Sequence, residues 1–153
     1  MAKSNKNSIH EDLIKSVSKL CVQYIDKYQD QVLGIYLSPY RVGGKQRIEV
    51  VIVDNAANEK KPIELNEKET NINDLKIVFN TNPVNFYKKR ASSYNYKLLR
   101  DLNYGSIVYD TKGKLSLIKS TAHNDENIVK PFNSYELPAG VPKLLKKKNL
   151  FIF

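Results

Sequence analysis

The sequence predicts an α+β protein in which helices pack on a mixed β-sheet. Three observations support this prediction: a helix-periodic segment near the N-terminus, two apolar strand-like segments around a glycine-containing turn, and a third such strand followed by a second helical segment. The predicted order is helix, strand, strand, loop, strand, helix and hairpin. This order is typical of domains that layer helices against a sheet.

The first predicted element is a helix from Ile9 to about Tyr28. Ser8 and Glu11 have the spacing of a capping box, which satisfies free backbone N–H groups in the first helical turn. We expect the apolar face of this helix to pack against the sheet. Apolar side chains recur at helical spacing at Leu13, Val17, Leu20, Cys21, Tyr24 and Tyr28.

Three strands are predicted next, at Val32–Leu37, Arg47–Val53 and Leu75–Phe79. The first two flank a polar turn at Arg41–Gln46 that contains paired glycines. The second strand is apolar on both faces for most of its length, which indicates a central strand of a covered sheet. Residues 55–73 are highly charged and predict a surface loop, in which "PIEL" could form a short strand. We expect the three strands to lie side by side.

The second half of the chain is predicted to contain one long helix and a β-hairpin. Pro83 suits a first helical position and Gly105 suits a C-terminal stop, so the helix should run between them. The hairpin would pair "SIVYD" with "LSLIK" across a "TKGK" turn. From Ser120 onwards we expect irregular structure, with an apolar end at Leu150–Phe153. The apolar stripe of the long helix would contain Val84, Tyr87, Ala91, Tyr94, Leu98 and Leu102.

Length and composition limit the class of protein. A chain of 153 residues with 41% hydrophobic residues favours one folded domain with a single core. It contains no apolar run long enough to span a bilayer, and its polar N-terminus has no signal-peptide segment. Cys21 is the only cysteine, so a disulfide framework is excluded, and the residues for a zinc site are lacking. These features predict a cytoplasmic protein with no membrane association.

The basic residues are concentrated in one part of the chain. The formal net charge is +9, and residues 83–120 hold eight basic residues but only two acidic ones. Such an excess favours a polyanionic partner, either nucleic acid or an acidic protein surface, although ordinary solvated surface is the alternative explanation. Tyr94 and Tyr96 lie among these bases, and aromatic rings can stack nucleobases. The candidate polyanion-binding residues of this segment are Lys88, Lys89, Arg90, Lys97 and Arg100.

Two stretches of the sequence together resemble a known superfamily. They are "IYLSPYRVGG...IEVVIV", residues 35–53, and "LLRDLNYGSIVYD", residues 98–110. Their motifs and the order of elements are similar to those of the minimal nucleotidyltransferase superfamily, which has the DNA polymerase beta-like fold. The resemblance covers about residues 9–119. It implies a nucleotidyltransferase-like domain at residues 1–119 and a C-terminal extension at residues 120–153 packed on that domain.

The resemblance also implies a magnesium site for nucleotidyl transfer, in which carboxylates on the sheet hold the metal. The family's Gly-Ser turn, which approaches phosphate, falls on Leu37 and Ser38, so a side chain obstructs the backbone. The family has two carboxylates separated by one residue. The first falls on Glu49, but the second position is Val51. A single carboxylate rarely holds Mg²⁺, because this ion prefers several hard oxygen ligands.

A third family carboxylate falls near Lys76, and a shift of register would offer Asp74 instead. We therefore expect Glu49 to be a half-buried acid paired with a base such as Lys76. Asp54 would lie on the opposite face of the strand from Glu49, because their separation is odd. No metal site is predicted, and the only remnant catalytic candidates are Ser38, Glu49 and Asp74.

The resemblance and the charge together suggest a catalytically impaired nucleotidyltransferase-like protein that acts by binding. Its partner would be nucleic acid or a nucleic-acid-binding protein, with Arg41 as a further anion contact and no cofactor. One alternative is an active, divergent nucleotidyltransferase of a toxin–antitoxin or abortive-infection system, which would need Mg²⁺. Another is a phage-encoded inhibitor of a host enzyme. The bias towards Lys, Asn, Ile and Tyr is typical of AT-rich genomes, including those of phages and mobile elements.

Overall fold

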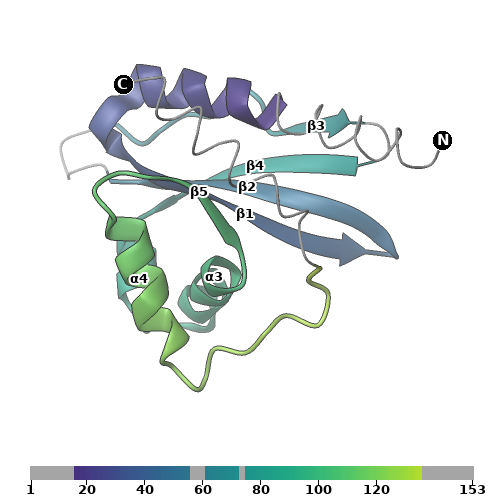
Figure 1. The fold of residues 1–153 in the computed structure, drawn as a ribbon, viewed down its shortest axis with the longest axis vertical. Coiled ribbons are helices and arrows are strands. Elements are labelled where there is room, and N and C mark those ends of the chain that lie inside the picture. Colours follow the sequence, from purple (N-terminus) through teal and green to yellow (C-terminus); the bar gives the residue numbers. More distant parts are fainter. Residues whose placement is uncertain (1–15, 56–60, 73–74, 136–153) are drawn as a thin grey trace.

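The fold has three layers, in which helices cover both faces of a five-stranded sheet (Figure 1). Helical residues 16–28 lie on one face, and α2 (Asn85–Lys88), α3 (Ser93–Asn103) and α4 (Lys114–His123) lie on the other. The α+β class predicted from the sequence is therefore confirmed. This computed structural model describes residues 16–55, 61–72 and 75–135.

Five strands form the sheet: β1 (Val32–Val42), β2 (Lys45–Asp54), β3 (Glu69–Ile72), β4 (Leu75–Pro83) and β5 (Ser106–Asp110). Their order in space is β3–β4–β2–β1–β5. The β2–β4 pair is parallel, whereas β1–β2, β1–β5 and β3–β4 are antiparallel, so the sheet is mixed. The three strands predicted side by side are β1, β2 and β4, and that prediction is confirmed.

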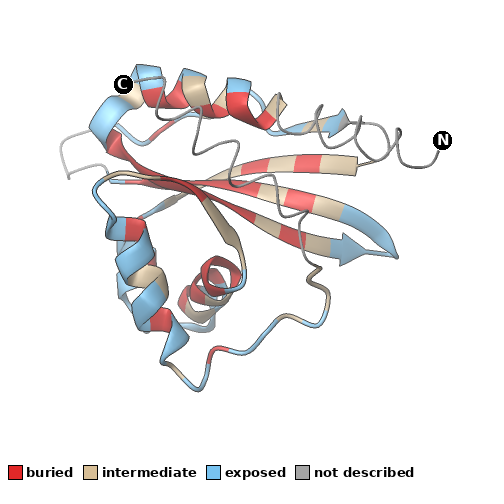
Figure 2. Cartoon of the chain, in the orientation of Figure 1, coloured by how far each residue is buried: buried red, intermediate tan, exposed pale blue. Residues whose placement is uncertain are grey.

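The central strands are buried on both faces, because their apolar side chains alternate between two cores (Figure 2). On the helix 16–28 side, Leu20 is partly buried and packs against the core, while Leu13 lies outside the described residues. This core contains Val17, Cys21, Tyr24, Ile48, Val50 and Ile52, among others. The core under α3 and α4 contains Val51, Val53, Leu98, Leu99, Leu102 and Leu115, among others.

The single long helix predicted between Pro83 and Gly105 is wrong. The strand β4 continues through Pro83, α2 is one turn long, and the backbone at Lys89 is extended. A new helix then begins after Ser92, whose hydroxyl oxygen accepts a hydrogen bond from the Asn95 N–H at 3.3 Å. This N-cap satisfies a free backbone donor and starts α3 separately from α2.

The predicted apolar stripe is correspondingly only partly right. Its members Val84, Tyr87, Leu98 and Leu102 are buried. The other two, Ala91 and Tyr94, are exposed, because the break between α2 and α3 turns them away from the core.

The predicted C-terminal hairpin is half right. "SIVYD" is the edge strand β5, but "LSLIK" belongs to α4 rather than to a paired strand. The Asp110 carboxylate accepts hydrogen bonds from the backbone N–H groups of Leu115 and Ser116, at 3.0 and 2.9 Å. An acidic side chain that accepts from free N–H groups of a first turn stabilises a helix there.

Two further corrections concern the loops. The charged segment predicted as a loop contains β3, which pairs with β4 at the sheet edge, whereas residues 61–65 are not a strand. The predicted turn at Arg41–Gln46 is narrower than expected, because β1 and β2 extend to Val42 and Lys45. Gly43 and Gly44 alone make the turn, with φ values of 57° and 79°. Glycine suits both positions because it adopts positive φ without a steric penalty.

After α4 the chain returns to the β1–β2 hairpin. The Arg41 N–H donates to the Asn133 carbonyl at 2.8 Å, and the Tyr135 hydroxyl donates to the Arg47 carbonyl at 2.9 Å. Residues 133–135 therefore lie against the β1–β2 hairpin, while the predicted apolar end at residues 150–153 lies outside the described residues. Within the described part of the chain, none of the helices has the length and apolar character needed to span a bilayer.

Candidate functional site

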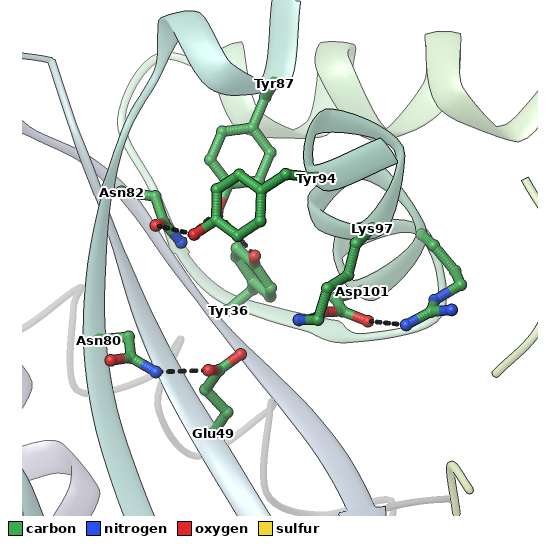
Figure 3. Close-up of polar contacts among 9 residues, drawn as sticks. Tyr36, Glu49, Asn80, Asn82, Tyr87, Tyr94, Lys97 and Asp101 are labelled. Carbon is green, nitrogen blue, oxygen red and sulfur yellow. Dashed lines mark hydrogen bonds and ion pairs between the residues drawn. The ribbon is translucent and has the colours of Figure 1, made fainter. Parts of the chain in front are cut away.

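A group of polar and aromatic side chains gathers between the sheet and α3 (Figure 3). Strand alternation points members of β1, β2 and β4 towards the face that carries α3, while α2 and α3 contribute the rest. Hydrogen bonds and ion pairs hold most of these side chains in place. We call this group the β4–α3 polar cluster; it consists of Tyr36, Glu49, Asn80, Asn82, Tyr87, Tyr94, Lys97, Arg100 and Asp101.

Glu49 is the acidic side chain on the sheet side of the cluster. It is half-buried and accepts a hydrogen bond from Asn80 Nδ2 at 2.5 Å. Burial raises the pKa of Glu49 above its ordinary value, and the negative charge of Asp101 raises it further. The Asn80 hydrogen bond and the positive charge of Lys97 oppose this rise without cancelling it. The surroundings of Glu49 therefore disfavour its ionised form, and Asn80 contacts one of its two oxygens.

The predicted pairing of Glu49 with Lys76 is wrong. In the parallel β2–β4 register, Lys76 lies beside Arg47, and its ammonium pairs with Glu69 of β3 at 3.0 Å. The neighbour of Glu49 on β4 is Val78. In the part of the chain that the structure describes, Glu49 forms no ion pair.

Two basic side chains of α3 share one buried acid. Lys97 Nζ lies 2.9 Å from one oxygen of Asp101, and Arg100 Nη2 lies 3.5 Å from the other. Burial lowers the pKa of Lys97, but its hydrogen bond to Asp101 and the charges of Asp101 and Glu49 more than offset this, so the pKa is raised. Lys97 therefore stays charged, and Asp101 compensates part of the positive charge of this helix.

Two buried tyrosines connect the sheet to α2. The hydroxyl groups of Tyr36 and Tyr87 lie 2.7 Å apart, and Asn82 Nδ2 donates to the Tyr87 hydroxyl at 3.2 Å. The Tyr94 hydroxyl donates to the other side of the Asn82 amide, at 3.4 Å. Burial raises the pKa of both Tyr36 and Tyr87, so the two phenols stay neutral. This network fixes Asn82 and the outer ring, Tyr94, against the sheet.

The remnant catalytic candidates are only partly brought together. Ser38 lies directly opposite Glu49 in the β1–β2 register, so two of the three are neighbours on one face. Val51, two residues after Glu49, is buried in the apolar core, and the third candidate, Asp74, lies outside the described residues. Asp54 faces the other core side, where it accepts from Gln31 Nε2 and the Ile63 N–H, as predicted from its odd separation.

The side chains around Glu49 do not fit a magnesium centre. Mg²⁺ requires several oxygen ligands, but the same-face neighbours of Glu49 on β2 are Arg47 and Val51, and its neighbour on β4 is Val78. In the described ranges, no group of three or more His, Cys, Asp and Glu side chains could hold a metal ion.

A second feature adjoins the polar cluster on α2 and α3. Phe86 and Tyr94 are 39% and 49% exposed, and their rings meet edge to face with centroids 6.0 Å apart. Lys88 and Lys89 follow Phe86 in the chain, are exposed, and form no ion pair with a described residue. We call these four residues the α2–α3 surface.

The remaining predicted polyanion contacts are dispersed. Arg90 Nε pairs with Asp125 at 2.8 Å, and the Arg41 guanidinium lies over the Tyr135 ring at 5.0 Å from its centroid. Lys89 does not share a helix with Lys97 and Arg100, because α2 ends at Lys88 and α3 is a separate helix.

Sequence reasoning missed Phe86, Asn80 and Asn82. The predicted third strand ends at Phe79, so Asn80 and Asn82 fall outside it and are not placed on a sheet face. The available signal was the period-two alternation of "LKIVFNTN", which continues past Phe79 and places Asn80 and Asn82 on the same face. Phe86 carried no signal, because its exposure depends on the break after α2.

Comparisons with known proteins give no match. No family model, no curated protein and no solved structure matches the chain. The resemblance to the nucleotidyltransferase superfamily therefore depends on the sequence pattern alone.

Proposed function

We propose that this protein is a non-catalytic nucleotidyltransferase-like domain that binds a polyanion, single-stranded nucleic acid, through the α2–α3 surface. The observation that carries the proposal is the exposed Phe86–Tyr94 ring pair, which the exposed basic residues Lys88 and Lys89 follow closely in the chain. Proteins that bind single strands combine a basic surface along the backbone with rings on which successive bases stack.

The exposed rings favour nucleic acid over an acidic protein surface as the partner. Phe86 and Tyr94 keep large parts of their rings in water, although burial of such rings would be favourable. An unpaired nucleobase offers a flat face that covers a ring, whereas bases in a duplex are already stacked on each other. The ammonium groups of Lys88 and Lys89, which pair with no acid in the described ranges, supply the charge that phosphates need.

The absence of catalysis is proposed from the surroundings of Glu49. Nucleotidyl transfer needs a metal to neutralise the triphosphate and align the attack. The apolar side chains of Val51 and Val78 flank Glu49, and Asn80 occupies one of its oxygens. These contacts support a site that binds polar groups rather than one that holds Mg²⁺.

The test is fluorescence anisotropy with a single-stranded oligonucleotide of about 10 nucleotides. Phe86→Ala combined with Tyr94→Ala should weaken binding by at least about tenfold, because each stacked base contributes about 1–3 kcal/mol. Tyr104→Ala is the matched control, since this ring is 39% exposed but lies beyond the C-terminal end of α3. Equal affinities of the double variant and the wild type would refute the proposed function.

A further inference from the structure

Glu49 has hydrogen-bonding capacity that the described residues leave unused. Its Oε2 accepts from Asn80, but no described residue donates to Oε1. Oε1 is not among the fully enclosed polar atoms without a partner, so it keeps some contact with solvent. An ionised carboxylate accepts about four hydrogen bonds and donates none. Glu49 can therefore receive two further donors from a ligand.

Lys97 provides donors close to this acceptor. Its ammonium group has three N–H bonds, and one hydrogen bond goes to Asp101 at 2.9 Å. Figure 3 shows the Lys97 side chain reaching from α3 towards the strand that bears Glu49. The charges of Lys97 and Glu49 each influence the pKa of the other, so the two groups lie near each other. Lys97 nevertheless forms its ion pair with Asp101 and not with Glu49. A ligand group that accepts from Lys97 and donates to Glu49 can therefore bridge the two side chains.

The stacking surface is connected to the same place. Tyr94 lies one helical turn before Lys97 on α3, and its hydroxyl donates to Asn82. Asn82 and Asn80 project from the same face of β4, and Asn80 in turn holds Glu49. A base next to one stacked on Tyr94 would thus meet Glu49 and Lys97 with its edge. This step depends on the proposed function.

The pattern of donors and acceptors selects one nucleobase. Guanine presents two adjacent donors, N1–H and the N2 amino group, beside the acceptor O6 on its Watson–Crick edge. A carboxylate can accept from both donors while an ammonium group donates to O6. Adenine, cytosine, thymine and uracil do not present two adjacent donors. We propose that Glu49 and Lys97 form a guanine-reading subsite beside the α2–α3 surface.

The experiment compares oligothymidine strands that carry one central guanine, hypoxanthine or 7-deazaguanine. Hypoxanthine lacks the N2 amino group, whereas 7-deazaguanine keeps the whole Watson–Crick edge. We expect guanine and 7-deazaguanine to bind about tenfold more tightly than hypoxanthine, in the range that a bidentate base contact provides. Glu49→Gln should remove this preference, because an amide offers one acceptor instead of two.

Each outcome decides the inference. Equal binding of guanine and hypoxanthine strands by the wild type would overturn the subsite and leave the proposed function standing. A preference that survives in Glu49→Gln would place the reading residue elsewhere. Failure of every strand to bind would overturn the proposed function and the subsite together. Circular dichroism of Glu49→Gln, with Glu64→Gln as an exposed matched control, verifies that the fold is intact.

Discussion

At the scale of single residues, the burial of Glu49 predicts how the free energy of unfolding changes with pH. Its pKa is raised mainly by burial, so the folded protein holds this proton more tightly than the unfolded chain does. Above the ordinary value of 4.5, ionisation of Glu49 therefore lowers the free energy of unfolding until the raised pKa is passed. Glu49→Gln carries no such charge and keeps an oxygen that can accept from Asn80.

We expect wild type and Glu49→Gln to be similarly stable below pH 4.5, and the variant to become the more stable one as pH rises. Urea unfolding at a series of pH values measures this difference directly. If the wild type instead gains stability relative to the variant as pH rises, then the pKa of Glu49 is lowered in the folded protein. The attraction of Lys97 would in that case outweigh the effect of burial on this pKa.

The same residue shows how far a sequence determines a site. The face of Glu49 and the opposite face of Asp54 follow from strand alternation alone, and both are as predicted. The partner of Glu49 was predicted wrongly, because it depends on the register between β2 and β4. That register places Val78 beside Glu49, and strand periodicity within one segment carries no information about it.

At the scale of elements, substitutions in α4 test whether this segment is a helix or the second strand of a hairpin. In a strand, Leu115 and Leu117 would share a face, whereas in a helix they point in different directions. Leu115 is fully buried and Leu117 is 69% exposed. Leu115→Ala should cost about 2–5 kcal/mol of unfolding free energy, and Leu117→Ala about 0.5 kcal/mol or less. Chemical denaturation measures both, and equal costs would favour the hairpin over α4.

The errors at this scale have a common physical reason. "LSLIK" is short, and a run of five residues fits a strand and a helix about equally well. The residue that decides is Asp110, five positions before Leu115, whose carboxylate caps the first turn of α4. Likewise, helix-compatible residues fill the segment from Pro83 to Gly105, and the cap at Ser92 divides it. Capping contacts between neighbouring segments thus override local periodicity.

At the scale of the whole molecule, the layered architecture was the most predictable feature. Arg47–Val53 is apolar on both faces, which requires cover on both sides, and the two cores supply it. The proposed site lies on the face of the sheet that α3 covers, where Glu49 and Asn80 project from β2 and β4. The cover on both faces of the sheet could thus be deduced from the sequence, while the exposed ring pair could not.

The architecture also makes a prediction about chemistry. With Val51 and Val78 beside Glu49, we expect no transfer of a labelled nucleotide from ATP to the protein or to RNA with Mg²⁺ or Mn²⁺. Autoradiography after incubation measures this. Metal-dependent labelling that disappears in Glu49→Gln would establish the active-enzyme alternative, with Ser38 opposite Glu49 as the next residue to substitute.

We propose above that this molecule binds single-stranded nucleic acid through the α2–α3 surface, where Lys88 and Lys89 contact the phosphates. Its most direct test is the affinity for an oligonucleotide over a series of salt concentrations, for the wild type and for Lys88→Ala combined with Lys89→Ala. Lys19→Ala combined with Lys61→Ala is the control, because it removes the same charge from exposed residues outside the α2–α3 surface. We expect log affinity to fall linearly with log salt, with a slope that becomes shallower by about 0.7 per lost phosphate contact only in the first variant. Identical slopes for the wild type and both variants would contradict the account.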